Sequence, residues 1–298
     1  MDPFKLASIR TRRGVRAAVV VDELAYELPD ELSGIPAGSL FALLQRWHLA
    51  LPMLARLAER KGEGAVDQYP LAQVQFAAPI LYPRKLLMAG ANYAEHTQEM
   101  VGQRADRATQ RPYAFLKATE GCVIGFGEAI VRPAGVEQLD WEGELAVVIG
   151  RAAKDVPAAK AFDYVAGYTI MNDVTARERT HRGDSVFEYD WYAAKSCDTF
   201  GPMGPYLVPR EFVPEPENLR LVTTVSGQVM QDSSTKHMIY SIAELIAFLS
   251  RAATLAPGDV ISTGTPSGVG MGRGIFLEPG DTVAVEIEGL GRLENPVV

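Results

Sequence analysis

From residue 85 to its C-terminus, the chain consists largely of short apolar runs separated by turns rich in glycine and proline. Runs of this length, bounded in this way, are typical of β-strands. We expect strands at 86–88, 145–149, 165–171, 221–225, 260–263 and 282–287. The one strong helical pattern in this part covers 241–253 and begins at a capping residue, Ser241. The pattern favours a β-rich domain over a regular βαβ series.

The first 75 residues have a different pattern. Residues 5–27 alternate apolar runs with a basic turn, which predicts a hairpin, and residues 40–60 show helical spacing after a capping Ser39. A polar stretch and the prolines at 70, 79 and 83 follow. We therefore predict a β-rich α+β protein with a small N-terminal α+β domain over 1–75 and a larger domain over 76–298.

Three carboxylates in two short runs are the strongest functional signal. Glu142 and Glu144 lie in LDWEGEL (139–145), and Asp173 lies in IMNDVTAR (170–177). Alternate residues of a strand face the same side, so both glutamates can converge on one hard cation that the aspartate completes. Acidic alternation more often marks a solvated strand face. Here Trp141 and the apolar run after Glu144 indicate burial, where a carboxylate needs a cation, a proton or a donor.

His96 and Glu99 are three residues apart in the polar run GANYAEHTQEM (90–100). This spacing brings both side chains to one face of a helical turn, and a carboxylate beside an imidazole makes a general base. The alternative is an ordinary capping or surface pair. The run lacks the His-Glu-x-x-His motif, which excludes a zinc protease of that type.

The net charge of −8, from 29 basic and 37 acidic residues without a long basic block, argues against a nucleic-acid surface. The chain has no signal-peptide core and no run of about 18 apolar residues, so we expect a soluble cytoplasmic protein without membrane association. Cys122 and Cys197 are far apart and are expected to be free thiols. A small anionic ligand would need local positive charge, for which the candidates are Lys117, Arg177 and Lys195.

Five further runs join the carboxylates, and the combination resembles the fumarylacetoacetate hydrolase superfamily. The runs are GANYAEHTQEM (90–100), FLK (115–117), AKSCDTFGPMGP (194–205), VSGQVMQ (225–231) and PGDVISTGTPSGVG (257–270). The likeness extends from about residue 86 to the C-terminus. It points to the branch of acylpyruvate hydrolases and 2-hydroxyhepta-2,4-diene-1,7-dioate isomerases.

The resemblance implies a mixed β-roll or sandwich with Mg²⁺ or Mn²⁺ in a central cleft, and a homodimer. It implies that His96 and Glu99 lie on a lid segment that becomes ordered over the substrate. It further implies that the Lys195 ammonium steadies negative charge on a substrate oxygen, and that Thr265 holds the substrate carboxylate. The remaining candidates for substrate contact are Tyr93, Arg177 and Lys117.

Several positions limit what can be carried over from the family. A glutamine commonly stands seven residues after the metal-binding aspartate, and here that residue is Thr180. The polar segment 180–190 differs from many relatives, and its His181 either contacts a distal carboxylate or is an ordinary loop histidine, the interpretation we prefer. Lys195 precedes a segment rich in glycine and proline that is typical of a turn. The glycines between 264 and 274 lack the order of a nucleotide-binding loop.

A divalent cation held by three carboxylates keeps open positions, which a 2-oxo acid can fill with its carboxylate and oxo oxygens. We expect a hydrolase that cleaves a carbon–carbon bond in an acylpyruvate such as fumarylpyruvate or maleylpyruvate, in aromatic-compound catabolism. Alternatives on the same site are an isomerase of hydroxymuconate-type dienols and an oxaloacetate decarboxylase. A non-catalytic dicarboxylate-binding protein is the alternative of another class, and the intact set of base, lysine and carboxylates argues against it.

Overall fold

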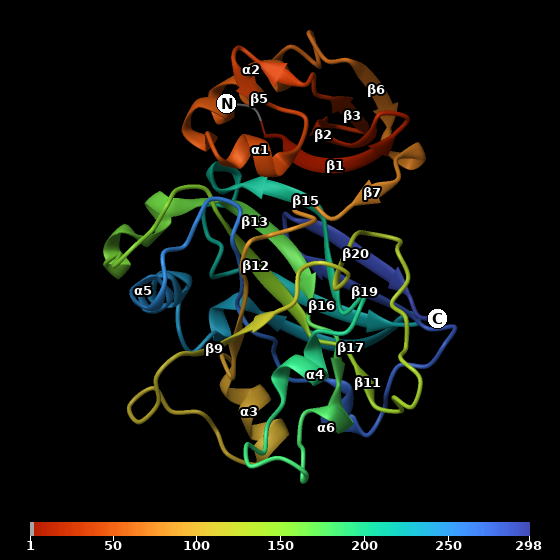
Figure 1. Ribbon diagram of the computed structural model, residues 1–298, viewed down its shortest axis with the longest axis vertical. Helices are drawn as coiled ribbons and strands as arrows, with labels where there is room; N and C mark the ends of the chain where they lie inside the picture. Colours follow the sequence, from red (N-terminus) through yellow and green to blue (C-terminus); the bar gives the residue numbers. More distant parts are fainter. Residues whose placement is uncertain (1–2) are drawn as a thin grey trace.

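The computed structural model describes residues 3–298, and a twelve-stranded sheet runs through most of the molecule (Figure 1). Its strands follow the order β6, β3, β2, β1, β15, β13, β12, β18, β8 and β9, with β7 paired to β1 and β10 paired to β15. The N-terminal strands are β1 (Lys5–Thr11), β2 (Gly14–Val21), β3 (Leu24–Glu27) and β6 (Asp67–Pro70). The others are β7 (Phe76–Ala77), β8 (Leu86–Gly90), β9 (Tyr113–Lys117), β10 (Val123–Ile124), β12 (Gly143–Ile149), β13 (Val165–Asn172), β15 (Gly201–Pro209) and β18 (Val260–Ser262).

A second, four-stranded antiparallel sheet packs against β12 and β13. It consists of β17 (Gln228–Ser234), β16 (Arg220–Val225), β19 (Thr282–Ile287) and β20 (Gly291–Pro296), in that order. Two short ribbons complete the strands, one of β4 (Glu31–Leu32) with β5 (Ile35–Pro36) and one of β11 (Leu139–Asp140) with β14 (Thr175–Ala176). The predicted β-rich α+β architecture with packed sheets is confirmed, and each strand predicted after residue 85 is present.

The helices are few and short. They are α1 (Leu40–Leu44), α2 (Trp47–Glu59), α3 (Ala94–Val101), α4 (Trp191–Lys195), α5 (Ile242–Ala252) and α6 (Gly270–Arg273). Ser241 starts α5 with a capping box in which its side chain and that of Glu244 satisfy each other's backbone N–H groups. The helix predicted over 40–60 is two helices, because the backbone after α1 turns tightly, with the Arg46 N–H bonded to the Leu43 carbonyl at 3.0 Å. No helix among residues 3–298 is long and apolar enough to span a bilayer.

Strand β15 corrects one prediction. The glycine- and proline-rich segment after Lys195 was expected to be a turn, yet Gly201–Pro209 lie inside the main sheet between β1 and β13. Pro205 falls where the register between β13 and β15 shifts, so the sheet loses no regular hydrogen bond at this proline. A bulge therefore accommodates a residue that the pattern alone assigns to a turn.

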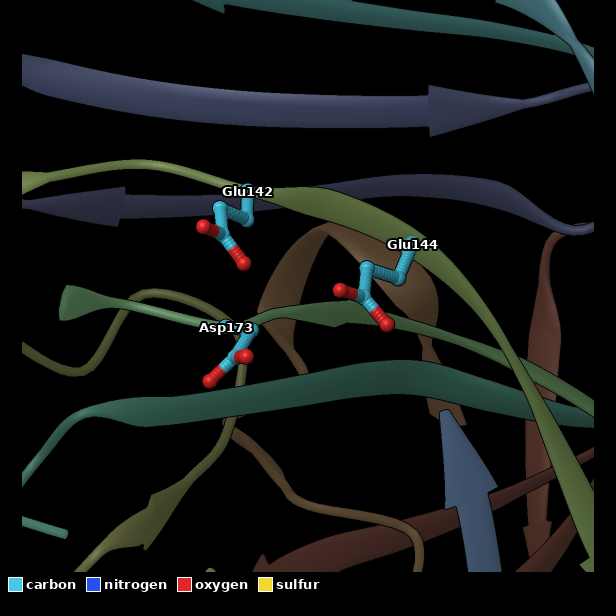
Figure 2. A group of neighbouring side chains, drawn as sticks. All are labelled: Glu142, Glu144 and Asp173. Atoms are coloured by element: carbon cyan, nitrogen blue, oxygen red, sulfur yellow. The ribbon is translucent and has the colours of Figure 1, made fainter. Parts of the chain in front are cut away.

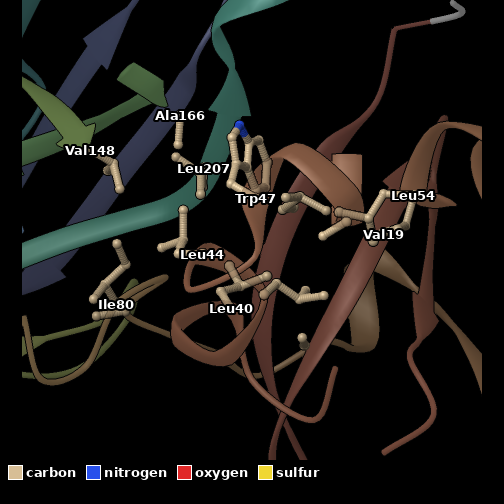
Figure 3. Packing of buried hydrophobic residues seen from close by; sticks show 14 of the residues in the cluster. Val19, Leu40, Leu44, Trp47, Leu54, Ile80, Val148, Ala166 and Leu207 are labelled. Carbon is tan, nitrogen blue, oxygen red and sulfur yellow. The ribbon is translucent and has the colours of Figure 1, made fainter. Parts of the chain in front are cut away.

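The N-terminal segment shares its sheet and its core with the rest of the chain. Strand β1 pairs with β15 through Leu6 and Leu207. Figure 3 shows Leu44 and Trp47 of the N-terminal helices beside Ala166 and Leu207, within one buried hydrophobic cluster. The division of the chain near residue 75 stays a prediction.

Strand β12 separates two cores and thereby sets the position of the acidic residues. Its odd-numbered residues, such as Leu145 and Val147, pack toward the four-stranded sheet, whereas Ala146 and Val148 face the core shared with the N-terminal segment. Glu144 belongs to the even-numbered face. In Figure 1 this start of β12 lies toward α3, α4 and α6, at the end of the molecule away from the N-terminal segment.

Candidate active site

Three buried carboxylates converge at the start of β12 and the end of β13. Ligand oxygens of Glu142, Glu144 and Asp173 lie within 4.8 Å of one another, and Figure 2 shows the three side chains pointing into one space. Antiparallel pairing sets Glu144 opposite Met171, and the Asp173 N–H donates to the Glu142 carbonyl at 2.8 Å. The residues are 5%, 2% and 2% exposed, respectively, so the alternative of a solvated acidic face does not hold.

The residue between the two glutamates must be small. A β-carbon on Gly143 would lie 2.3 Å from the Thr223 Oγ1 and 3.0 Å from the Val285 Cγ1 of the facing sheet. Because a side chain would collide there, the glycine lets the start of β12 lie closer to the four-stranded sheet than a bulkier residue would allow.

Lysine and arginine side chains surround two of the carboxylates. The Lys195 Nζ donates to Glu142 at 2.9 Å, to Asp173 at 2.7 Å and to the Thr175 hydroxyl at 2.8 Å, so all three of its N–H groups are used. Arg177 donates to Glu142 at 2.6 Å. Burial acts to raise the pKa of Glu142, but Lys195 and Arg177 outweigh it and hold that pKa well below its usual range.

Glu144 has no such partner. It accepts hydrogen bonds from the Ser262 hydroxyl at 2.5 Å and from the Gly264 N–H at 2.8 Å. Within residues 3–298, no lysine, arginine or histidine forms an ion pair with it. Burial, together with the charges of Asp173 and Glu142, raises the pKa of Glu144 well above its usual range. The three carboxylates supply hard oxygen donors, and one of them, Glu144, is buried without a counter-charge. Both features fit a divalent cation at this position.

His96 and Glu99 both lie on α3, with 3.6 Å between the His96 Nδ1 and the Glu99 Oε2. The Gly268 N–H donates to both oxygens of Glu99 at 3.0 and 3.1 Å and so fixes that carboxylate. Helix α6 comes close to the same side chain, since a β-carbon on Gly272 would lie 2.3 Å from the Glu99 Cγ. Glu99 is thus held from two sides in a position next to His96, as the orienting group of a base requires.

The three carboxylates line one cavity of about 440 Å³ together with His96, Arg177, Lys195 and Thr265, whereas Glu99 lies behind His96 and outside this lining. The Thr265 hydroxyl donates to the Gly143 carbonyl at 2.9 Å and accepts from the Gln231 amide at 2.8 Å. Thr265 is therefore anchored to Gly143, the residue between the two glutamates. Thr180 and His181 also line the cavity, and the His181 Nε2 lies 3.7 Å from the Glu188 Oε2.

Two residues expected to contact substrate are placed differently. Lys117 is buried outside the cavity lining, and its Nζ donates to Asp173 at 2.5 Å and to the Val174 carbonyl at 3.1 Å. This geometry makes Lys117 a support for Asp173. Tyr93 is also buried outside the lining, and its hydroxyl has no hydrogen-bond partner among residues 3–298. Burial, aided by the Glu144 charge, raises its pKa, which keeps the phenol neutral.

Comparison with protein families agrees with this geometry. A family model described as "Fumarylacetoacetate (FAA) hydrolase C-terminal" matches residues 85–298, most of the chain. The chain belongs to the fumarylacetoacetate hydrolase family. It is also 38% identical over 262 residues to the mitochondrial oxaloacetate tautomerase Fahd2a of Rattus norvegicus. The matched region covers 87% of this chain and 80% of that relative.

Solved structures of related proteins have the same fold. The 5-carboxymethyl-2-hydroxymuconate delta-isomerase of Mycobacterium smegmatis is 36% identical, with a TM-score of 0.76 and coverage of 99% of both chains. The maleylpyruvate hydrolase of Sphingobium sp. SYK-6 is 27% identical, with a TM-score of 0.78 and the same coverage. Relatives that share the fumarylacetoacetate hydrolase fold are therefore named as isomerases, tautomerases or hydrolases.

One buried residue of this family member was not singled out from the sequence. Asp140 accepts from the Arg177 Nε at 2.7 Å and from the backbone N–H groups of Trp141, Gly270 and Met271. It thereby connects Arg177 to the start of α6. Its place two residues before Glu142, on the same side of the chain, was the available signal. Gln231, the last residue of the run 225–231, similarly bonds both Gly143 and Thr265.

Proposed function

We propose that this protein is a divalent-metal-dependent hydrolase that cleaves a carbon–carbon bond in an acylpyruvate-type 2,4-dioxo acid through the enolate of its pyruvate part. One observation carries the proposal: His96, whose Nδ1 lies 3.6 Å from the Glu99 Oε2, lines the same cavity as the carboxylate cluster. The base would therefore face a substrate whose oxo acid end is held by the ion bound to the cluster. The identity of the ion, Mg²⁺ or Mn²⁺, belongs to the proposal as well.

Glu142, Glu144 and Asp173 would hold the ion, which when bound supplies Lewis-acid polarisation of the oxo and carboxylate oxygens of the substrate. The protein's own groups perform the proton transfers. His96, oriented by Glu99, removes a proton from water as the water oxygen adds to the distal carbonyl carbon. The bond between that carbon and the neighbouring methylene carbon then breaks. Its electron pair enters the enolate of pyruvate, and a proton returned to the former methylene carbon completes pyruvate beside the carboxylic acid formed from the acyl group.

Lys195 contributes charge rather than a free donor in this arrangement. Its three N–H groups are bound to Glu142, Asp173 and Thr175. Burial acts to lower its pKa, yet Asp173 and Glu142 raise that pKa above its usual value, so the ammonium stays charged. A fixed positive charge beside the cavity stabilises negative charge that develops on the substrate oxygen.

A second candidate is a tautomerase or isomerase that uses the same base without attack by water. The names of two relatives, an oxaloacetate tautomerase and a hydroxymuconate isomerase, favour it. Oxaloacetate decarboxylation would use the same enolate, with carbon dioxide as the group that departs.

Pyruvate release from fumarylpyruvate and other acylpyruvates tests the proposal. Metal-stripped protein is assayed with and without added Mg²⁺ or Mn²⁺, beside the His96→Gln variant. We expect pyruvate release that depends on the added metal, and we expect His96→Gln to lower its rate about a hundredfold. Loss of the enol absorbance without pyruvate would support the tautomerase or isomerase. Binding of a 2-oxo acid without turnover in any assay would support the non-catalytic alternative.

A further inference from the structure

A row of aromatic rings leads away from the carboxylate cluster along the cavity wall. The Lys195 Nζ lies 5.7 Å from the centre of the Phe115 ring. Phe115 stacks on Trp191 with 5.4 Å between ring centres, and Trp191 stacks on Tyr189 with 5.9 Å between centres. All three rings line the cavity. Exposure increases along the row, from the buried Lys195 to Tyr189 at 57%, so the row runs from the interior to the cavity mouth.

The row is built on the same elements that carry the charged groups. Phe115 lies on β9, two residues before Lys117, the residue that holds Asp173. Trp191 is the first residue of α4 and Lys195 the last, and the Asp190 side chain caps this helix through the Ala193 N–H at 2.9 Å. Phe115 and Trp191 are therefore fixed relative to the carboxylate cluster by short connections within β9 and α4, and Tyr189 stacks on Trp191.

Further apolar side chains line the cavity. Met100 and Val101 of α3 and Met271 of α6 line it together with the aromatic row. Within residues 3–298, the lysine and arginine residues that line the cavity are Arg177 and Lys195, and both are bound to carboxylates of the cluster. His181 at the mouth lies next to Glu188, whose charge offsets that of a protonated imidazole. A second substrate carboxylate in this region would leave water without gaining a cation.

We propose that the distal acyl group of the substrate is uncharged and aromatic, so that the substrate is a 4-aryl-2,4-dioxo acid rather than a dicarboxylate such as fumarylpyruvate. This inference rests on the proposed function for the oxo acid end, and it assigns the other end of the same cavity. An aryl ring at that position packs against Phe115, Trp191 and Tyr189, where offset stacking adds to the burial of apolar surface.

Binding measurements test the inference without any turnover. The probes are 4-phenyl-2-oxobutanoate and 2-oxoadipate, which share the oxo acid end. The first ends in a phenyl group after two methylene groups, and the second ends in a carboxylate after three. Neither has a carbonyl that the proposed hydrolysis could attack. With Mg²⁺ present, calorimetry is expected to show the phenyl compound bound at least about tenfold more tightly. Equal affinity, or tighter binding of 2-oxoadipate, would overturn the assignment.

Substitutions along the row locate the effect. Trp191→Ala and Tyr189→Ala are expected to weaken binding of the phenyl compound by about tenfold while changing that of 2-oxoadipate less than threefold. Tyr192→Ala is the matched control, because Tyr192 neighbours Trp191 but is 71% exposed and does not line the cavity. Should Trp191→Ala fail to fold, Tyr189→Ala, at an exposed position, decides alone. An equal loss of affinity for both probes would also overturn the assignment.

Turnover separates this inference from the proposed function. If benzoylpyruvate releases pyruvate with a higher kcat/KM than fumarylpyruvate, the result supports both the hydrolase function and the aromatic distal group. If fumarylpyruvate is the better substrate, the hydrolase stands and the aromatic assignment falls. If neither releases pyruvate, the hydrolase falls, and the probe affinities still decide the chemistry of the distal end.

Discussion

Gly272 of α6 lies so close to Glu99 of α3 that a β-carbon on the glycine would come within 2.4 Å of the Glu99 carboxyl carbon. The Glu99 carboxylate occupies the space that a side chain at 272 would need. The contact joins two helices that are far apart in the sequence and fixes the carboxylate next to His96.

The substitution Gly272→Ala is therefore expected to displace Glu99 from the Gly268 N–H and from His96. Turnover should fall by about tenfold or more, since the base loses its orienting group, while metal affinity stays unchanged. Steady-state kinetics and metal titration measure the two effects. Gly183→Ala is the control, because a β-carbon there meets nothing within 4 Å. Wild-type activity in Gly272→Ala would show that the base works without Glu99 in its present place.

Glu142 and Glu144 are expected to contribute differently to the stability of the metal-free protein. Glu142→Gln leaves Lys195 and Arg177 each without one charged partner, and should lower the free energy of unfolding by about 2 kcal/mol. Glu144→Gln removes a carboxylate that has no ion pair, and should leave stability unchanged or raise it. Both variants should bind Mn²⁺ more weakly by at least about tenfold.

Urea unfolding and calorimetry with Mn²⁺ measure these differences between the glutamates. In the wild type, Mn²⁺ at a hundred times its Kd should stabilise the fold by about 2.7 kcal/mol. Equal destabilisation by both substitutions would contradict the asymmetry of their partners.

Asp140→Asn tests the buried connection between Arg177 and α6. Four N–H groups donate to this carboxylate, and an amide presents one oxygen where the carboxylate presents two. We expect a loss of about 3 kcal/mol in unfolding free energy, with faster hydrogen exchange at the Gly270 and Met271 amides. Asp155→Asn, at an exposed residue, should change stability by less than about 0.5 kcal/mol. Unchanged exchange at both amides would show that Asp140 does not hold α6.

The two cysteines should differ in reactivity. Burial raises the pKa of Cys122 to about 11, so its thiol stays protonated at pH 8. The folded state holds this proton more tightly than the unfolded chain, and the resulting stability is lost as the pH rises through 11. Half-buried Cys197 is the thiol expected to react with iodoacetamide, and Cys197→Ser should abolish labelling. Labelling of Cys122 in the native protein at pH 8 would contradict its burial.

Local patterns of the sequence predicted a large part of this architecture. The alternation of residues on β12 predicted that Glu142 and Glu144 share a face, and the spacing of His96 and Glu99 predicted their common helical turn. Ser241 and Glu244 marked the start of α5. These features depend on neighbours within a few residues, which a sequence displays directly.

Features that depend on distant partners could not be predicted in this way. Lys117 carries a charge suited to an anionic ligand, and only the fold shows that Asp173, 56 residues away, takes that charge. Phe115 and Trp191 were visible as aromatic residues, but their stacking follows from the placement of β9 beside α4. Strand β15 was hidden because its prolines resemble those of a turn. Its place in the sheet depends on a register shift that no local pattern encodes.

The pairing of β1 with β15 has a consequence for self-association. One side of β15 is paired along its length to β13, and the other side is closed first by β10 at Gly201 and then by β1 at Leu207. Without the N-terminal strand, the backbone N–H and carbonyl groups near Leu207 would be open to pairing with strands of other molecules. The first strand of the chain therefore protects the sheet that carries the chemistry from aggregation, whatever else the N-terminal segment does.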